Sequence, residues 1–300
     1  MSPPGSSGPP DLDAWRRAAR IAAEARELGA RLAVPGRSLY DLAQEIEGFI
    51  RKNGAEPAFP ANLSRNDEAA HFTPPPDDGI SLASGDLLKV DVGAHIGGAI
   101  ADTATTVAVG GGRKNESLVK AAHEAVEAGI ARVHGGSSVN EIATAIESTI
   151  GRRGFKPIRD LTGHTIEPYL LHAGKSVPNV AGLSAARLDA GEVVAIEPFA
   201  TNGAGGIENG PFGNILRFRR APVGVDRDVA ALFDRFRTLP FTLRWVDDLD
   251  LRRRVLAARR QLQSYPVFLE RGHGLVAQAE HTVLVTPDGV EVLTRLGDDR

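Results

Sequence analysis

The chain has 300 residues and a net charge of −3, with 42% hydrophobic and 24% charged residues, a balance typical of a soluble globular enzyme. This small charge provides no global field to attract nucleic acid or an anionic membrane. The absence of cysteine excludes disulfides, thiolate metal sites and cysteine nucleophiles. Any metal must therefore be held by oxygen and imidazole ligands, which suit Mn, Fe, Co or Zn.

Residues 1–12 predict a short disordered tail, because the first ten are rich in Pro, Gly and Ser. They lack the basic region and the apolar core of a signal peptide. No apolar run elsewhere approaches the ~20 residues of a membrane span. We therefore expect a cytoplasmic protein with no membrane partner.

A pair of helices repeats at an offset of one hundred residues. Residues 13–32 predict a helix, and Ser38 then caps a second helix that ends at Gly54. One hundred residues later, residues 120–133 predict a helix, and a second capped helix follows. The identities at this offset are Ser38/Ser138, Ala43/Ala143, Ile46-Glu47/Ile146-Glu147, Ile50/Ile150, Gly54/Gly154 and Pro57/Pro157.

Between the helix pairs, Lys89–Thr103 predicts a β-hairpin, because both arms are β-prone and Gly97-Gly98 suits a tight turn. If Ile96 and Gly97 centre the turn, Asp91 faces Asp102 directly, with Cβ atoms roughly 4.5–5.5 Å apart. Two carboxylates that close repel, so we expect a cation between them. The metals of a dinuclear site lie about 3.5–4 Å apart, which such a pair can bridge.

The strand that carries Asp91 also has a counterpart. Residues 82–91 and 188–197 share a turn glycine, an acidic residue and an apolar strand that ends in a second carboxylate, Asp91 or Glu197. The common order of elements favours two duplicated α/β halves over chance similarity. Such halves would pack around a pseudo-two-fold axis, and the two carboxylates would meet at a central cleft, where ligands tend to bind.

The last third of the chain is not duplicated. Residues 220–264 predict a mostly helical segment, in which Asp226 or Asp228 caps the run 229–237 and residues 251–262 form an arginine-rich helix. The arginines could contact ribosomal RNA. A solvated helix face fits better, because a buried side is available from Leu251, Val255, Leu256 and Leu262. After this segment, residues 274–285 predict one strand and Pro287–Gly289 a turn.

Five residues could form a site of hard donors: Asp91, Asp102, His164, Glu197 and Glu280. Taken alone, His164 is more often a turn or core histidine than a ligand, Glu197 could cap its strand, and Glu280 could face solvent. The two aspartates lie among apolar residues, where unpaired carboxylates are costly. Together the five supply four carboxylates and one imidazole, a set that can hold divalent metal.

The chain resembles the methionine aminopeptidases of type II, most closely their archaeal form, from about residue 13 to its end. The resemblance is carried by Ala58-Phe-Pro-Ala-Asn-Leu-Ser64, Ala69-Ala-His-Phe-Thr-Pro74, Lys89-Val-Asp-Val-Gly-Ala-His95 with Ile100-Ala-Asp-Thr103, Gly163-His-Thr-Ile166, Leu171-His-Ala-Gly-Lys-Ser-Val-Pro178, Ala195-Ile-Glu-Pro-Phe199 and Ala277-Gln-Ala-Glu-His-Thr282. It implies the α/β "pita-bread" fold, with a catalytic domain of residues 13–219 and 265–300 and a helical insertion of residues 220–264. The resemblance to type II rests on the 83 residues that separate Glu197 from Glu280. Type I enzymes resemble the rest of the chain but lack the insertion that fills this gap.

The resemblance also implies a dinuclear metal site. Asp102 and Glu280 would each bridge the two ions, Asp91 would complete one ion, and His164 with Glu197 the other. A bridging hydroxide would be the nucleophile, with Glu197 as the general base.

Four further residues match the substrate site of that family. His71 and His172 would serve the scissile carbonyl and the leaving amide nitrogen. Phe59 and Tyr265 would line an apolar pocket for the methionine side chain.

The implied activity is removal of the initiator methionine from nascent polypeptides, with a small second residue preferred. Nascent N-termini would be the partners of a monomeric enzyme; a transient ribosome contact stays open, and no specific nucleic acid is expected. One alternative is a prolidase or aminopeptidase P, although those usually carry an additional N-terminal domain. The other is a non-catalytic relative that binds RNA or protein, although such relatives lose metal ligands.

Overall fold

The structure is a computed structural model that describes residues 11–76, 79–111 and 113–297. Its helices are α1 (Leu12–Leu32), α2 (Leu39–Lys52), α3 (Arg113–Ile130), α4 (Val139–Arg152), α5 (Arg227–Phe236) and α6 (Leu249–Ala257), with 3-10 helices η1 (Leu243–Trp245) and η2 (Arg259–Gln261). Its strands are β1 (Glu56–Pro57), β2 (Asn62–Arg65), β3 (Glu68–Ala70), β4 (Leu87–Ile96), β5 (Ala99–Ala108), β6 (Lys156–Pro157), β7 (Thr162–Ile166), β8 (Ser176–Pro178), β9 (Val193–Ile196), β10 (Phe199–Thr201), β11 (Ile207–Phe218), β12 (Leu262–Glu270), β13 (Val276–Gln278), β14 (His281–Thr286) and β15 (Gly289–Val292). Among the described helices, none has the length and apolar character needed to span a bilayer.

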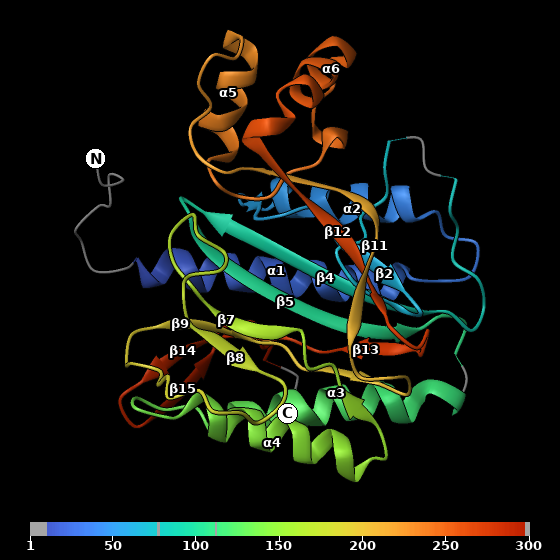
Figure 1. Ribbon diagram of the computed structural model, residues 1–300, viewed down its shortest axis with the longest axis vertical. Helices are drawn as coiled ribbons and strands as arrows, with labels where there is room; N and C mark the ends of the chain where they lie inside the picture. The colour runs from blue at the N-terminus through green and yellow to red at the C-terminus, as the bar shows by residue number, and fades with distance from the viewer. Residues whose placement is uncertain (1–10, 77–78, 112, 298–300) are drawn as a thin grey trace.

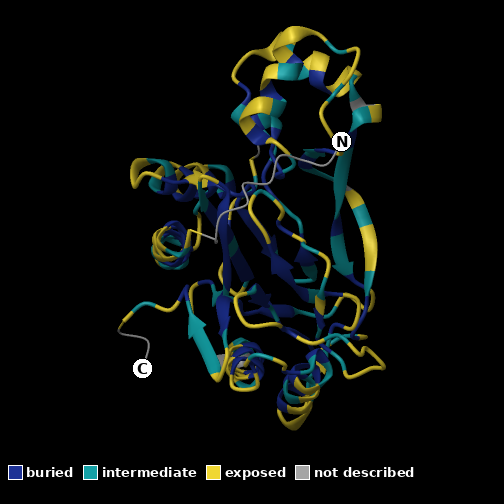
Figure 2. Ribbon diagram, turned by 90° about the vertical axis from the view of Figure 1, so that its left-hand side faces the viewer, coloured by how far each residue is buried: buried dark blue, intermediate teal, exposed yellow. Residues whose placement is uncertain are grey.

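Helix α1 packs on strands β4 and β5, whereas helices α3 and α4 lie together in the lower part of the molecule, beside strands β13, β10 and β8 (Figure 1). β4 pairs with β1, β2 and β5, while β9 lies in a five-stranded sheet of order β15-β14-β9-β7-β8. Buried residues gather in these strands and on the inner helix faces, as the dark blue ribbon in Figure 2 shows. Each helix pair covers its own apolar cluster, so the core has two halves.

Hydrogen bonds confirm the predicted duplication. The Ser38 hydroxyl caps α2 by accepting from the N–H of Asp41, and Ser138 caps α4 in the same way, accepting from Asn140. Gly54 and Gly154 end the two helices with φ of 84° and 80°. The same local chemistry therefore sets the bounds of both helices.

Close packing between the helices repeats as well. A Cβ atom on Gly29 of α1 would lie 2.7 Å from the side chains of Ile46 and Val90. At the equivalent place, a Cβ atom on Gly129 of α3 would lie 3.1 Å from Ile146. Glycine in both helices thus lets the first helix of each pair approach the second.

The predicted ends of two helices need correction. The carboxylate of Asp11 caps α1, which begins at Leu12, so these two residues do not belong to the predicted tail; residues 1–10 lie outside the described residues. Helix α3 spans Arg113–Ile130 rather than residues 120–133.

The hairpin forms as predicted, but its register differs by two residues. Gly93 faces Asp102, and Asp91 faces Ala104. Gly97 and Gly98, with φ of 58° and 94°, occupy the two central turn positions. A two-residue hairpin turn of this kind needs positive φ at both places, which glycine adopts without strain and isoleucine does not. A shift of two residues keeps the side chains on their face of the sheet, so the two aspartates still share one face.

The helical insertion lies between the paired strands β11 and β12. Asp226 caps α5, as one of the two predicted alternatives. The predicted helix of residues 251–262 is instead α6, which ends at Ala257, because Leu262 already pairs with Phe218 of β11. Leu256 is 51% exposed and does not belong to the buried side of that helix.

The predicted strand of residues 274–285 is two strands, β13 and β14, and the break between them falls at Ala279-Glu280. Ala104 of β5 forms an isolated bridge with Glu280 at this break. The side chain of Glu280 is therefore placed beside the hairpin that carries the two aspartates.

Candidate active site

One pocket of about 210 Å³ lies where the two halves meet. It brings together every site residue that the sequence predicted: Phe59, His71, Asp91, Asp102, His164, His172, Glu197, Tyr265 and Glu280. The roles assigned to these residues stay predictions.

Strand pairing explains how distant residues reach this pocket. Asp91 and Asp102 come from β4 and β5, and His164 from β7. Glu197 follows β9, which pairs with β14 so that Ile196 faces His281, and this places Glu197 near Glu280. The hydroxyl of Thr282 accepts from the N–H of Asp102 at 2.8 Å and donates to its carbonyl at 2.7 Å, joining β14 to the hairpin.

The polar groups form a compact cluster. The His164 Nε2 atom lies 3.4 Å from Glu197 Oε1 and 3.8 Å from Asp102 Oδ2. One donor atom from each of Asp102, His164 and Glu280 lies within 4.8 Å of the others. Such a spacing of oxygen and imidazole donors suits a divalent metal ion.

Gln278 was not predicted as a site residue, although it lies within the matching stretch Ala277–Thr282. Its Nε2 donates to Asp91 Oδ2 and to Glu280 Oε2, both at 3.3 Å. Gln278 is buried at the end of β13. It therefore links a carboxylate of the first half to one of the second.

Three buried carboxylate oxygens in the pocket, Asp91 Oδ1, Asp102 Oδ1 and Glu280 Oε1, have no hydrogen-bond partner. Burial raises the pKa of Asp91 to about 7. Burial, followed by the charges of neighbouring carboxyls, raises the pKa of Asp102, Glu197 and Glu280 well above their usual range. A cluster whose charged forms are this unfavourable needs protons or bound cations. The residues present thus fit a metal site.

The two histidines outside the ligand set differ in their surroundings. The ring of His71 lies 4.6 Å from that of Phe268 and 5.2 Å from that of Tyr265. Burial lowers the pKa of His71 to about 4, so this imidazole is neutral at pH 7. His172 is more exposed, on the rim, with its ring 4.3 Å from that of His164, but partial burial and then the charge of Arg217 lower its pKa to about 4 as well.

The rest of the pocket wall is largely apolar. Phe59 and Tyr265 are joined there by residues that were not predicted as pocket residues, namely Leu161, Leu171, Phe199, Ile215, Pro240 and Phe268. A Cβ atom on Gly93 would lie 2.3 Å from the ring of Phe59, so glycine beside Asp102 makes room for this ring. Of these residues, Phe199 and Leu171 lie within the matching stretches, whereas Leu161 and Ile215 lie outside them.

Comparisons with known proteins show the family of this chain. The model of metallopeptidase family M24 matches residues 13–287. Methionine aminopeptidases of Pyrococcus abyssi and Methanocaldococcus jannaschii are 45% and 39% identical over 295 and 285 residues; the matches cover 95% and 93% of this chain and 99% and 96% of those proteins. The crystal structure of methionine aminopeptidase from Rickettsia prowazekii superposes with a TM-score of 0.72 at 23% identity, covering 95% of this chain and 97% of that one, which confirms the predicted pita-bread fold. The chain therefore belongs to metallopeptidase family M24, a family of hydrolases, alongside the methionine aminopeptidases of archaea.

Proposed function

We propose that this protein removes N-terminal methionine from polypeptides by metal-dependent hydrolysis. The observation that carries the proposal is the joining, in one pocket, of an apolar wall with a buried cluster of carboxylates and imidazole. The apolar part suits an unbranched thioether, which has no strong hydrogen-bonding group. The polar part would then face the scissile peptide bond beyond that side chain.

We propose two divalent ions, drawn from Co, Mn, Fe and Zn, as the cofactors. Asp102 and Glu280 would serve both ions, Asp91 one of them, and His164 with Glu197 the other. When bound, such ions lower the pKa of water and polarise a carbonyl. The unpartnered oxygens of Asp91, Asp102 and Glu280 support this assignment.

The residues around this centre would divide the proton transfers. Glu197 would accept the proton of the attacking water as general base. His71, neutral at pH 7, can offer one N–H to the carbonyl oxygen of the substrate. His172, on the rim, would pass a proton to the leaving amide nitrogen.

The second residue of the substrate should be small. It would lie just past the scissile bond, between His71 and His172, where a bulky side chain would clash. Met-Gly, Met-Ala and Met-Ser peptides should be cut, and Met-Lys or Met-Trp hardly at all.

A peptide panel on metal-analysed protein tests the proposal and separates it from its alternatives. Met-Ala-Ser should be cleaved at least 100-fold faster than Met-Lys-Ser, Lys-Ala-Ser and Ala-Pro. Equal cleavage of Lys-Ala-Ser would indicate a general aminopeptidase, and preference for Ala-Pro a prolidase. Protein that binds metal but cleaves none of these peptides would favour a binding role.

A further inference from the structure

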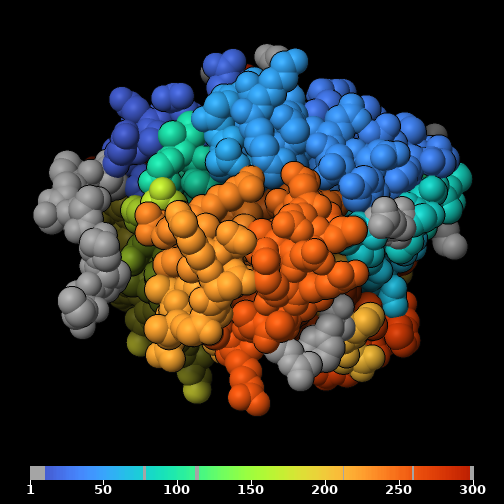
Figure 3. All heavy atoms as spheres, turned by 90° about the horizontal axis from the view of Figure 1, so that it is seen from above, coloured from blue at the N-terminus to red at the C-terminus, as the bar shows by residue number. Residues whose placement is uncertain are grey.

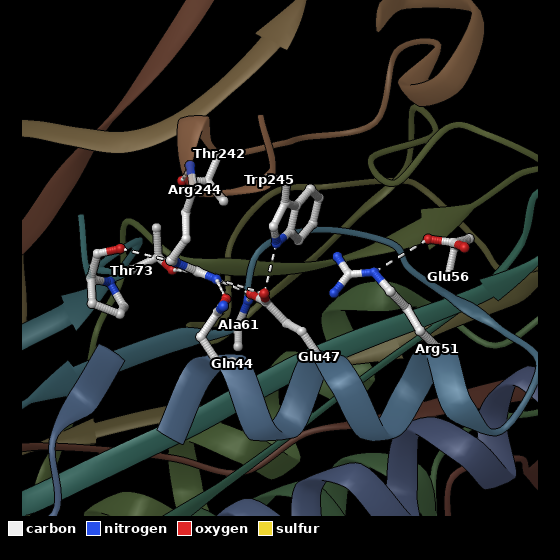
Figure 4. Close-up of polar contacts among 10 residues, drawn as sticks. Gln44, Glu47, Arg51, Glu56, Ala61, Thr73, Thr242, Arg244 and Trp245 are labelled. Carbon is white, nitrogen blue, oxygen red and sulfur yellow. Dashed lines mark hydrogen bonds and ion pairs between the residues drawn. The ribbon is translucent and has the colours of Figure 1, made fainter. Parts of the chain in front are cut away.

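A buried ion pair fastens the helical insertion to the first half of the molecule (Figure 4). The Arg244 guanidinium, in η1, donates to both carboxylate oxygens of Glu47 in α2, at 2.6 and 2.9 Å. Its other N–H groups donate to the Pro74 carbonyl at 3.2 Å, Gln44 Oε1 at 3.1 Å and Thr73 Oγ1 at 3.0 Å. All five guanidinium donors are therefore used.

The Glu47 carboxylate is equally well satisfied. Besides Arg244, it accepts from the indole N–H of Trp245 at 2.6 Å and from the backbone N–H of Ala61 at 3.1 Å. Neither Glu47 nor Arg244 has an exposed side chain. A buried pair with every group satisfied is rigid and holds a single geometry. In this it differs from the pocket carboxylates, three of which leave an oxygen unpartnered.

The contacts of this pair lead directly to the substrate pocket. Ala61 lies between Phe59 and Asn62, which both line the pocket. Thr73 and Pro74 follow His71, whose φ of 67° is unfavourable for a residue with a side chain and needs surrounding support. Two separate segments of the wall, residues 58–62 and 71–74, are thus held by one ion pair.

The third segment held in this way belongs to the insertion itself. Pro240 lines the pocket and precedes η1 by a few residues, and Phe241 pairs with Leu216, next to the pocket residue Ile215. Seen from above, the orange insertion lies directly beside the blue residues of the first half (Figure 3). The wall therefore combines parts far apart in sequence that meet at Arg244.

The duplicated half shows what the insertion added. Glu147 occupies the equivalent position in α4, and its carboxylate likewise accepts a backbone N–H, from Ala181 at 2.9 Å. Both halves thus use this glutamate to fix a following segment. In the first half, the insertion adds Arg244 as a further partner of the equivalent carboxylate, that of Glu47.

We propose that Arg244 is a positioning residue for substrate selection, which acts through Glu47 and Thr73 on the segments that carry Phe59 and His71. The inference rests on the proposed function for the identity of the side chain selected. The predicted metal ligands come from β4, β5, β7 and the segments after β9 and β13. The Arg244–Glu47 pair should therefore affect the binding of substrate and leave the binding of metal unchanged.

The test uses metal-loaded full-length protein and the variants Arg244→Lys, Arg244→Met and Thr73→Val, with Glu147→Gln as the matched control. Hydrogen–deuterium exchange in residues 58–64 and 70–73 should be at least tenfold faster in Arg244→Met, with the β4–β5 hairpin unchanged. KM for Met-Ala-Ser should rise at least tenfold while kcat changes less than threefold and metal content stays the same. Arg244→Lys keeps the charge but loses the planar guanidinium with its paired donors. Its exchange rates and KM should therefore stay close to those of Arg244→Met.

Thr73→Val keeps the ion pair and the side-chain shape, and should speed exchange in residues 70–73 alone. Unchanged exchange in both segments of folded variants would overturn the proposal, and so would faster exchange spread over the whole chain or an equal effect of Glu147→Gln. The exchange measurement needs no turnover. Local loosening in an enzyme that fails to cleave methionyl peptides would refute the proposed function, whereas normal cleavage with unaltered exchange would refute only the positioning role.

Discussion

Asp91 and Asp102 lie diagonally across the β4–β5 hairpin: Asp91 faces Ala104, and Asp102 faces Gly93. Diagonal pairs on one face of a sheet are wider apart than directly opposed pairs, at ~7–8 Å rather than ~5 Å between Cα atoms. The wider spacing lets the two carboxylates contact different sides of a shared site. It also leaves the position opposite Asp102 to a glycine, against which Phe59 packs.

The diagonal arrangement predicts unequal effects of amide substitutions. Asp102 lies 3.8 Å from His164 and belongs to the compact donor group with Glu280, whereas Asp91 reaches that group through Gln278. Asp102→Asn should therefore lose both metal ions, and Asp91→Asn only one. Elemental analysis after gel filtration checks this. Retention of equal metal by both variants would contradict the proposed bridging role of Asp102.

Replacement of the proposed base should separate chemistry from folding. Glu197→Gln keeps the size of the side chain but cannot accept a proton, so kcat should fall by about 10²–10⁴. The circular dichroism spectrum should match that of the unsubstituted protein. A variant that keeps both its metal and a near-normal kcat would show that another group is the base.

Metal binding should depend on pH, with a sign set by the raised carboxyl pKa values. A carboxyl whose folded pKa is raised keeps its proton in the metal-free protein at a pH where the unfolded chain has lost it. It therefore reduces stability as pH rises through that range. A bound cation replaces these protons, so the gain in Tm on metal addition should grow from pH 6 to pH 8.

Calorimetric titrations in buffers of different ionisation enthalpy check this prediction, because they count the protons released. Below about pH 7, the pKa of Asp91, affinity should fall ~tenfold per pH unit for each proton displaced. Groups outside the site titrate alike in metal-loaded and metal-free protein, so their contribution to the pH dependence cancels in the comparison. Lys89 is such a group, because burial lowers the pKa of its ammonium to about 7. An affinity independent of pH would contradict the metal assignment.

A methyl group at Gly93 should damage the pocket. In Gly93→Ala the new Cβ would lie 2.3 Å from the ring of Phe59, so the ring must move or the strand must bend. Overpacking of this kind costs about 1–3 kcal/mol of the free energy of unfolding, and we expect KM for methionyl peptides to rise. Steady-state kinetics and urea unfolding measure the two effects.

Gly48→Ala is the matched control for this substitution. Gly48 lies within α2, and a Cβ atom there would meet nothing within 4 Å. Alanine favours the helix by about 1 kcal/mol over glycine, so this variant should be somewhat more stable and equally active. Equal KM values for the two variants would show that Gly93 does not shape the pocket.

Local chemistry made the duplicated helices predictable from sequence. Ser38 and Ser138 are strong N-caps, and Gly54 and Gly154 adopt a left-handed conformation that ends a helix. The hairpin register was missed by two residues because it depends on which pair of residues takes the positive φ angles, and Ile96 was placed in the turn instead of Gly98.

The remaining misses depend on contacts between distant parts of the chain. The end of α6 is set by the pairing of Leu262 with Phe218, which no periodicity within residues 251–262 reveals. Gln278 was recognisable only as part of a matching stretch, because its two acceptors come from β4 and from the break after β13. Asp91, Asp102 and Glu197 were found because they lie in or directly after apolar strands, whereas His164 and Glu280 carried no strong signal of their own. The convergence of all five depends on sheet pairing.

The pairing of Phe218 with Leu262 means that the chain leaves the main fold and returns to it at neighbouring points. A segment attached in this way can be exchanged between related proteins without moving the strands at its base, because loop closure depends only weakly on loop length. The ion pair between Arg244 and Glu47, which holds the segment in place, limits this exchange. A transplanted segment would dock in the same pose only where the recipient offers Arg244 a carboxylate at the place of Glu47, so the two residues should be transferred together.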